Sequence, residues 1–173
     1  MKNPLIKVPL KYGIAGGLLV VLVFVVLFLL GENPLLMLQP FDFMLLPLFL
    51  FVSIREFRDV HNGRLMFFWQ GMTVGFFCYI IIALVSSVFI ILFLEFCDCN
   101  LLAEFITNKV EILESGKARV IEEMGQATYD KTVTDVEATT AFIVSLDNLL
   151  KKCILGLLFT IMLSMILRTK PKN

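Results

Sequence analysis

The chain has 173 residues, of which 58% are hydrophobic, and its 15 basic and 15 acidic side chains balance to a net charge of zero. A soluble domain of this size carries about half apolar residues, so the composition excludes an ordinary water-soluble globular protein. The four cysteines and single histidine show no CxxC and no paired metal-ligand spacing, so we expect no zinc site, no haem and no other cofactor. We predict an all-α integral membrane protein, a four-helix bundle with a small extracytoplasmic helical segment.

Residues 14–30 form the first predicted transmembrane helix, after a cytoplasmic N-terminus at residues 1–13. The run contains no charged side chain and, with a little flanking help, it can cross a hydrocarbon core of about 30 Å. A secretory signal peptide is the alternative, because three lysines precede the run. However, the run is longer than a typical signal-peptide core, and Leu29 stands where a small residue would precede a cleavage site. We therefore favour an uncleaved first span.

Three further apolar runs predict transmembrane helices at residues 35–54, 67–94 and 149–167. The second span includes Pro47, which removes a backbone hydrogen bond and should kink the helix. The third has 28 uncharged residues and would be about 42 Å long, so it tilts or extends beyond the bilayer. The fourth crosses fully only if lysines at its start, such as Lys152, extend their ammonium groups toward the membrane surface.

The distribution of charge between the spans predicts the orientation of the chain. If residues 55–66 (a turn) and 168–173 (a tail) share the cytoplasmic side with the N-terminus, these segments carry nine basic and two acidic side chains, whereas the rest of the chain carries six basic and thirteen acidic. Short cytoplasmic loops of membrane proteins are enriched in Lys and Arg. We therefore predict that both termini are cytoplasmic.

The predicted extracytoplasmic segment covers residues 95–148. Apolar side chains between Leu102 and Leu113 repeat at helical spacing, and we expect Gly116 and Gly125 to interrupt the helices. We predict a pair of amphipathic helices that cap the outer mouth of the bundle. The alternative is a solvated acidic linker with fraying helices.

Two glycine pairs have the spacing of one helical turn, Gly13 with Gly17 and Gly71 with Gly75. Small residues at this spacing let membrane helices approach closely. The first and third spans run in the same direction, and both pairs lie at their inner ends. We therefore predict that the two spans cross there, within one subunit or between two copies. The alternative is that the glycines are merely tolerated in membrane helices.

Three cysteines, Cys97, Cys99 and Cys153, fall at the outer end of the predicted bundle. In an oxidising periplasm, a disulfide from Cys97 or Cys99 to Cys153 would close a loop of about fifty residues and stabilise the fold. The other interpretation, which we favour, is that all of these cysteines are free, packed thiols.

Asp42 and Lys152 are predicted to reach a similar depth in the membrane. Measured from Arg55 and Arg168 at the inner surface, they lie about 20 Å and about 24 Å along their helices. A partly desolvated ion pair near the outer interface would mark a functional site. In the other interpretation, which the nearby Pro40 favours, Asp42 begins a helix and faces water.

The cytoplasmic turn contains Arg55, Arg58 and Arg64. These arginines could contact lipid headgroups or an acidic partner. Anchoring of the turn on the cytoplasmic side is the alternative, and it already explains their charge. Within the turn, Asn62-Gly63 predicts a tight reversal of the chain.

At this turn the chain resembles a family of small bacterial four-span membrane proteins, catalogued as domain-of-unknown-function family 4199. The family shows an Arg, a short gap, Asn-Gly, a Phe and a glycine-containing span, an order matched here by Arg58, Asn62, Gly63, Phe67, Gly71 and Gly75. The lysine-bearing start, acidic outer segment and basic tail are similar too, but the Cys-Asp-Cys sequence and the Arg55-Glu56 pair are not family features. The resemblance implies a bacterial inner membrane protein. Family genes near polyprenyl-phosphate glycosyltransferases imply a role in the cell envelope.

The sequence carries no hydrolase, phosphate-loop or metalloprotease motif, so we identify no catalytic residue. Our leading hypothesis is a non-catalytic accessory or scaffold protein of a cell-envelope complex. Its partners would be another envelope membrane protein or further copies of the chain, and not nucleic acid. The second hypothesis is a lipid-handling enzyme or flippase component acting on polyprenyl-linked substrates, which requires Asp42, Lys151 or Lys152 to face an internal cavity. The third is a small oligomeric transporter, for which the polar residues of the spans are sparse.

Overall fold

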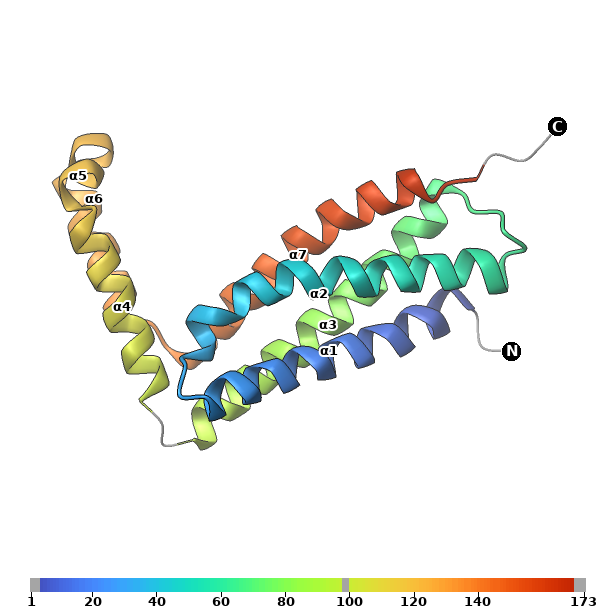
Figure 1. Ribbon diagram of the computed structural model, residues 1–173. Coiled ribbons are helices and arrows are strands. Elements are labelled where there is room, and N and C mark those ends of the chain that lie inside the picture. Colours follow the sequence, from blue (N-terminus) through green and yellow to red (C-terminus); the bar gives the residue numbers. More distant parts are fainter. Residues whose placement is uncertain (1–3, 98–99, 170–173) are drawn as a thin grey trace.

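The computed structural model describes residues 4–97 and 100–169, and these residues form an all-α structure. Four long helices lie together in a bundle (Figure 1): α1 (Pro4–Leu29), α2 (Pro34–Glu56), α3 (Phe68–Phe96) and α7 (Ala141–Ile166). One turn of π-helix, η1 (Phe57–His61), extends α2. Three shorter helices connect α3 to α7: α4 (Leu101–Ser115), α5 (Lys117–Met124) and α6 (Gln126–Glu137).

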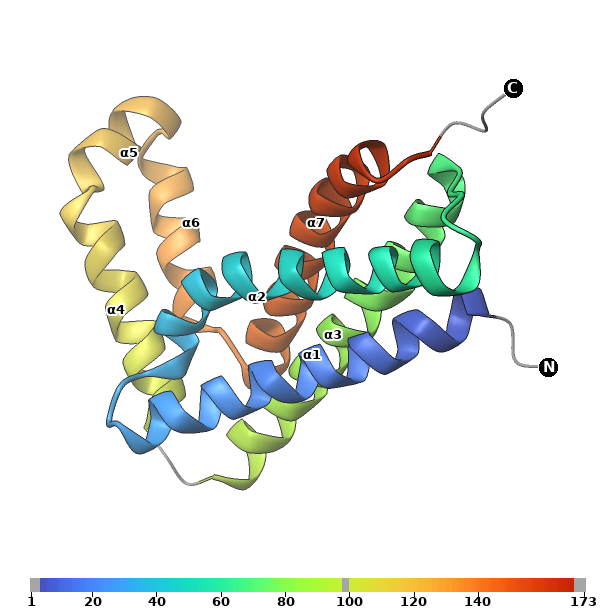
Figure 2. The same cartoon turned by 45° about the vertical axis from the view of Figure 1, so that its right-hand side comes forward.

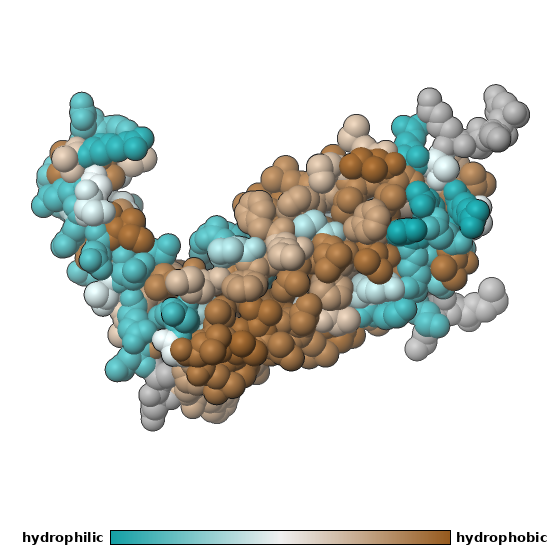
Figure 3. All heavy atoms as spheres, in the orientation of Figure 1, coloured by the Kyte–Doolittle hydropathy of each residue, from teal (hydrophilic) through white to brown (hydrophobic). Residues whose placement is uncertain are grey.

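The four long helices make this a multi-pass membrane protein. Each is long enough and apolar enough to cross a bilayer. Their outward-facing side chains form an apolar belt around the bundle, and hydrophilic residues gather beyond both ends of the belt (Figure 3). An apolar surface of this extent suits the hydrocarbon core of a membrane rather than water.

Helix α1 begins and α7 ends at the same end of the bundle, where η1 also lies, and we call this the termini end (Figure 1). The opposite end is the hairpin end, because α4, α5 and α6 project from it. Helix α3 contacts α1, α2 and α7, and its contact with α7 is the most extensive in the structure. Buried side chains of α3, including Val74, Cys78, Ile82 and Ile90, therefore form the centre of the core.

Two of the helices begin before the spans that hydropathy predicts. Helix α1 starts at Pro4 rather than at residue 14, and α7 starts at Ala141 rather than at residue 149. Both added segments mix polar with apolar side chains, which a helix tolerates where it extends beyond the hydrocarbon. Helix α2 follows its predicted span closely and continues through Pro47. Its 23 residues make it about 34 Å long, enough to cross the hydrocarbon core fully.

The sequence Asn33-Pro34 determines where α2 begins. Asn33 Oδ1 accepts a hydrogen bond from the backbone N–H of Leu35 at 3.0 Å, and Pro34 follows at a position where its missing N–H costs nothing. Through Nδ2, Asn33 also donates to the carbonyl of Leu101 at 2.9 Å and to the carboxylate of Glu104 at 3.2 Å. One side chain therefore caps α2 and ties the base of α4 to it.

Helices α4, α5 and α6 form a hairpin that projects from the bundle, with α4 and α6 side by side (Figures 1 and 2). The structure has three helices where the sequence predicts a pair, and the breaks fall at Gly116 and Gly125 as predicted. Gly125 has a φ of 86°, a left-handed conformation that favours glycine. The hairpin meets the bundle mainly where α4 begins beside α2, so it projects outward rather than capping the mouth of the bundle.

The glycine pair of α1 packs against α3. A Cβ atom added to Gly13 would lie 2.7 Å from Cβ of Ile81, and one added to Gly17 would lie 2.7 Å from Cβ of Val85. These distances leave no room for a side chain, so the glycines permit the close approach of the two helices. The first and third spans do pack together along this face.

The glycine pair of α3 packs against a different helix, α7. A Cβ atom added to Gly71 would lie 2.8 Å from Oγ of Ser164, and one added to Gly75 would clash with Cγ2 of Thr160 and lie 2.7 Å from its Oγ1. The prediction that the two glycine pairs meet each other is therefore wrong. Its cause is the register of the helices: because α1 begins at Pro4, the glycines of α1 lie beside the middle of α3 rather than beside its start.

Candidate functional site

The site is built around an ion pair buried between α2 and α7, in the half of the bundle nearest the hairpin. Lys152 Nζ lies 2.6 Å from Asp42 Oδ2 and 2.5 Å from Asn148 Oδ1. Lys152 is 1% exposed and Asp42 is 8% exposed. Burying charges this deeply costs free energy unless they are paired and hydrogen-bonded, and here they are both. Of the two interpretations that the sequence leaves open for Asp42, the structure has the buried pair.

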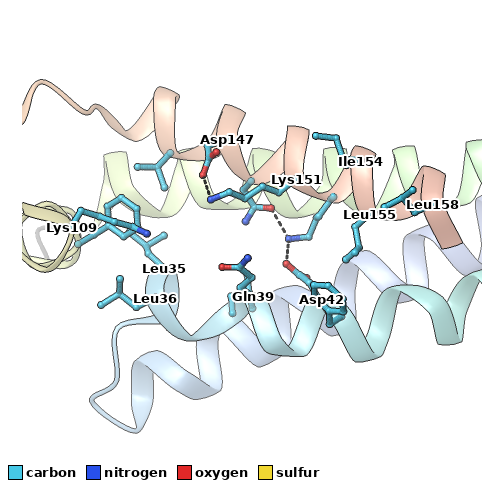
Figure 4. A pocket seen from close by; sticks show the side chains of 16 residues that line it. Leu35, Leu36, Gln39, Asp42, Lys109, Asp147, Lys151, Ile154, Leu155 and Leu158 are labelled. Carbon is cyan, nitrogen blue, oxygen red and sulfur yellow. Dashed lines mark hydrogen bonds and ion pairs between the residues drawn. The ribbon is translucent and has the colours of Figure 1, made fainter. Parts of the chain in front are cut away.

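A cavity of about 250 Å³ opens beside this pair and forms a groove between α2 and α7 (Figure 4). The charged residues of its lining lie toward the hairpin end. Nearer the middle of the bundle the lining is apolar and includes Ile154, Leu155 and Leu158. Further apolar side chains complete the wall: Leu35, Leu36, Leu38, Phe43, Phe105 and Val144. The charged side chains of the groove therefore lie at the hairpin end, among apolar ones, and its other end is apolar.

Two more lysines line the groove near the hairpin. Lys151 Nζ lies 2.5 Å from Asp147 Oδ2, and both side chains are about half exposed. Lys109 belongs to α4, and its ammonium group lies 5.4 Å from the centre of the Phe105 ring. Among the described residues, Lys109 forms no ion pair with a carboxylate. The groove thus contains three lysines and two aspartates, and one positive charge has no counter-charge.

The groove opens sideways onto the apolar belt. Phe43, Ile154 and Leu158 line it and are nevertheless 56%, 64% and 61% exposed. Their side chains therefore face the surroundings of the bundle as well as the cavity. Because the belt faces hydrocarbon, a molecule dissolved in the bilayer could enter the groove without crossing water. This geometry suits an amphiphile with its polar end beside the lysines.

Comparison with known proteins relates the chain to one family. The family model described as "Protein of unknown function (DUF4199)" matches residues 11–169. This chain belongs to the DUF4199 family. Searches of curated proteins and of solved structures find no match. The matched range includes every residue that lines the groove, so the groove lies within the DUF4199 part of the chain.

The turn that carries the resemblance to DUF4199 lies at the termini end. Gly63 and Arg64 have φ angles of 57° and 62°, which reverse the chain directly after η1. The side chain of Asn62 donates to Oε1 of Gln70 at 3.1 Å and so ties the turn to the first turn of α3. The Asn-Gly pair therefore has a structural role, because a left-handed conformation is most easily adopted by glycine.

The arginines of this turn contact other parts of the protein to different extents. Arg55 and Arg58 lie 3.4 Å and 2.7 Å from the carboxylate of Asp59, and Arg58 also donates to the carbonyl of Leu167 at 3.5 Å. Arg64 is exposed. Partly exposed ion pairs such as these contribute little free energy.

The structure describes three of the four cysteines. Cys78 and Cys153 are free thiols, which for Cys153 agrees with the interpretation of packed thiols. Cys97 directly follows α3, and Cys99 lies outside the described residues. In the described part of the chain, no group of three His, Cys, Asp or Glu side chains is placed to hold a metal ion.

The sequence pattern indicates Asp42 and Lys152 but not the groove around them. It misses Asn148, which completes the hydrogen bonding of Lys152. A signal for Asn148 exists, because residues four apart share one face of a helix. It also misses the contribution of Lys109 and Phe105 to the groove, because no pattern in the sequence shows that α4 lies beside the start of α2.

Proposed function

We propose that this DUF4199 protein binds a membrane lipid in the groove between α2 and α7. The observation that supports the proposal is the position and polarity of the groove, which opens sideways onto the apolar belt, with apolar walls toward the bundle centre and lysines toward the hairpin. Membrane lipids have the same polarity, an apolar chain joined to an often anionic headgroup. Among the functions that the sequence suggests, lipid handling therefore comes ahead of the scaffold role.

The proposed location is the extracytoplasmic side of the bacterial inner membrane. Residues 1–13, 55–66 and 168–173 carry nine basic and two acidic side chains, and short segments rich in Lys and Arg face the cytoplasm in most membrane proteins. With both termini inside, the hairpin and the charged end of the groove face the periplasm. The lipid would then enter from the outer leaflet of the membrane.

Leu155→Trp should fill the groove and abolish lipid binding there. A photoactivatable phospholipid, reconstituted with the wild-type protein, is expected to cross-link preferentially to the exposed groove residues Phe43 and Leu158, and mass spectrometry can map these positions. The indole ring introduced by Leu155→Trp should reduce this cross-linking to the level of other lipid-facing residues. Leu157→Trp, which lies on the same helix outside the groove, is the matched control and should change nothing. Cross-linking that is evenly spread and insensitive to Leu155→Trp would contradict the proposal.

A second function, the accessory role in a cell-envelope complex, is supported by the hairpin. The hairpin extends beyond the apolar belt (Figure 3), and it carries the exposed apolar side chains Ile112 and Met124. The proposed partner is another membrane protein of the envelope. Purification of the tagged protein from its native membrane in mild detergent, with cross-linking and mass spectrometry, should yield a stoichiometric partner joined through Lys117 or Lys131. Purification of the protein alone would count against this role.

A further inference from the structure

The charges of the groove narrow the class of lipid that it can hold. We propose that the ligand is a monoanionic phosphodiester lipid with a hydroxyl-bearing headgroup, bound with its phosphate beside Lys109. The proposal rests on the lipid-binding function above and adds the chemistry of the headgroup.

Two of the three lysines in the groove are already neutralised by the protein. Lys152 pairs with Asp42 at 2.6 Å, and Lys151 pairs with Asp147 at 2.5 Å. Lys109 is half-buried and lies over an aromatic ring, without a carboxylate partner in the described part of the chain. One negative charge on the ligand would therefore leave the groove electrically neutral.

Other headgroups match this charge less well. A polyprenyl diphosphate carries at least two negative charges, and the second would meet only lysines that already have a carboxylate partner. Because Lys109 is half-buried, an unbalanced charge beside it costs more free energy than it does in open solution. A zwitterionic headgroup brings a cation together with its phosphate, and an uncharged headgroup brings no anion, so either would leave the groove with a net positive charge. The monoanionic phosphodiester balances the groove without breaking either ion pair.

The polar groups around the cations also favour a headgroup that donates hydrogen bonds. Asp42 Oδ1 is buried and accepts no hydrogen bond from a described residue. The amide side chains of Gln39 and Asn148 line the same cavity. Asp42 Oδ1 is enclosed by the protein, so the headgroup would meet these amide groups instead, and their oxygens can accept hydrogen bonds from its hydroxyl groups.

Quenching of tryptophan fluorescence by brominated lipids tests which headgroup the groove prefers. The single tryptophan, Trp69, is replaced by Phe, and Phe43→Trp then places the reporter in the groove. Leu158→Trp is a second groove reporter, should the first variant fail to fold. Val88→Trp, on an exposed face of α3, is the reporter outside the groove. Bromine on an acyl chain quenches tryptophan on contact, so dibromo-phosphatidylglycerol compared with dibromo-phosphatidylcholine reports the headgroup preference at each reporter.

The groove reporters should prefer phosphatidylglycerol about fivefold, the ratio expected for one partly exposed ion pair, and Val88→Trp should show no preference. Lys109→Gln should remove the preference and Lys109→Arg should keep it. Lys131→Gln, which removes an exposed charge of the hairpin outside the groove, should have no effect.

Two results would overturn the headgroup assignment and leave lipid binding standing. One is equal quenching of the groove reporters by the two lipids. The other is displacement of phosphatidylglycerol from the groove by a smaller amount of polyprenyl diphosphate. A groove reporter that is quenched no more than Val88→Trp by either lipid would overturn the lipid-binding function itself.

Discussion

Lys152→Met should lower the free energy of unfolding by about 3–5 kcal/mol, the usual cost of removing one partner from a buried ion pair. The substitution removes the cation that lies 2.6 Å from Asp42 and leaves a carboxylate that is 8% exposed without its counter-charge. Methionine has nearly the same volume as lysine, so the loss of stability reports the missing charge rather than a cavity. Reversible unfolding in mixed micelles with increasing dodecyl sulfate, followed by circular dichroism, gives the free energy.

The neighbouring residue provides a matched control. The pair between Lys151 and Asp147 is about half exposed, so Lys151→Met should cost less than about 1 kcal/mol. Asp42→Leu combined with Lys152→Met should recover most of the lost stability, because the double substitution removes both charges from the interior. Equal losses for the two single lysine variants, or no recovery in the double variant, would show that the pair is not desolvated.

The number and order of the spans can be predicted from the sequence, because a long uncharged run has few alternatives to a membrane helix. The ends of the helices cannot be predicted in the same way. Residues 4–13 and 141–148 mix polar with apolar side chains, and whether a helix continues there depends on its neighbours. Lys11 and Tyr12, for example, both contact Glu56 of α2, a contact that the hydropathy of α1 does not reveal.

In the candidate site, the sequence predicts how deep a residue lies in the membrane but not the direction in which its side chain faces. The rise of a helix gives the depth of Asp42 and Lys152, but not the face on which each lies. That face follows from how α2 and α7 pack around α3. The contribution of Lys109 depends on the position of a whole hairpin, which is tied to α2 through Asn33. The glycine pairs likewise indicate close contacts without identifying the partner helix, as Gly75 illustrates.

Gly75→Val should lower the free energy of unfolding by about 3 kcal/mol, at the upper end of the usual cost of overpacking a core. A Cβ atom at this position would clash with Cγ2 of Thr160 and lie 2.7 Å from its Oγ1. Thr160 is 0% exposed, so its side chain has no open space into which to move. The contact between α3 and α7 is the most extensive in the bundle, and separating the two helices would open the core along its length.

A second substitution that removes the clash with Thr160 distinguishes overpacking from a general effect of removing a glycine. Thr160→Ala in the Gly75→Val chain should recover part of the loss, because it removes the two closest atoms and leaves Cβ at 3.1 Å. Thr160 Oγ1 has no hydrogen-bond partner among the described residues, so this second change breaks no hydrogen bond. Gly116→Val is the control, since a Cβ atom there meets no atom closer than 3.6 Å. If Gly75→Val destabilises the protein no more than Gly116→Val does, then α3 and α7 do not approach as closely as the glycine contacts require.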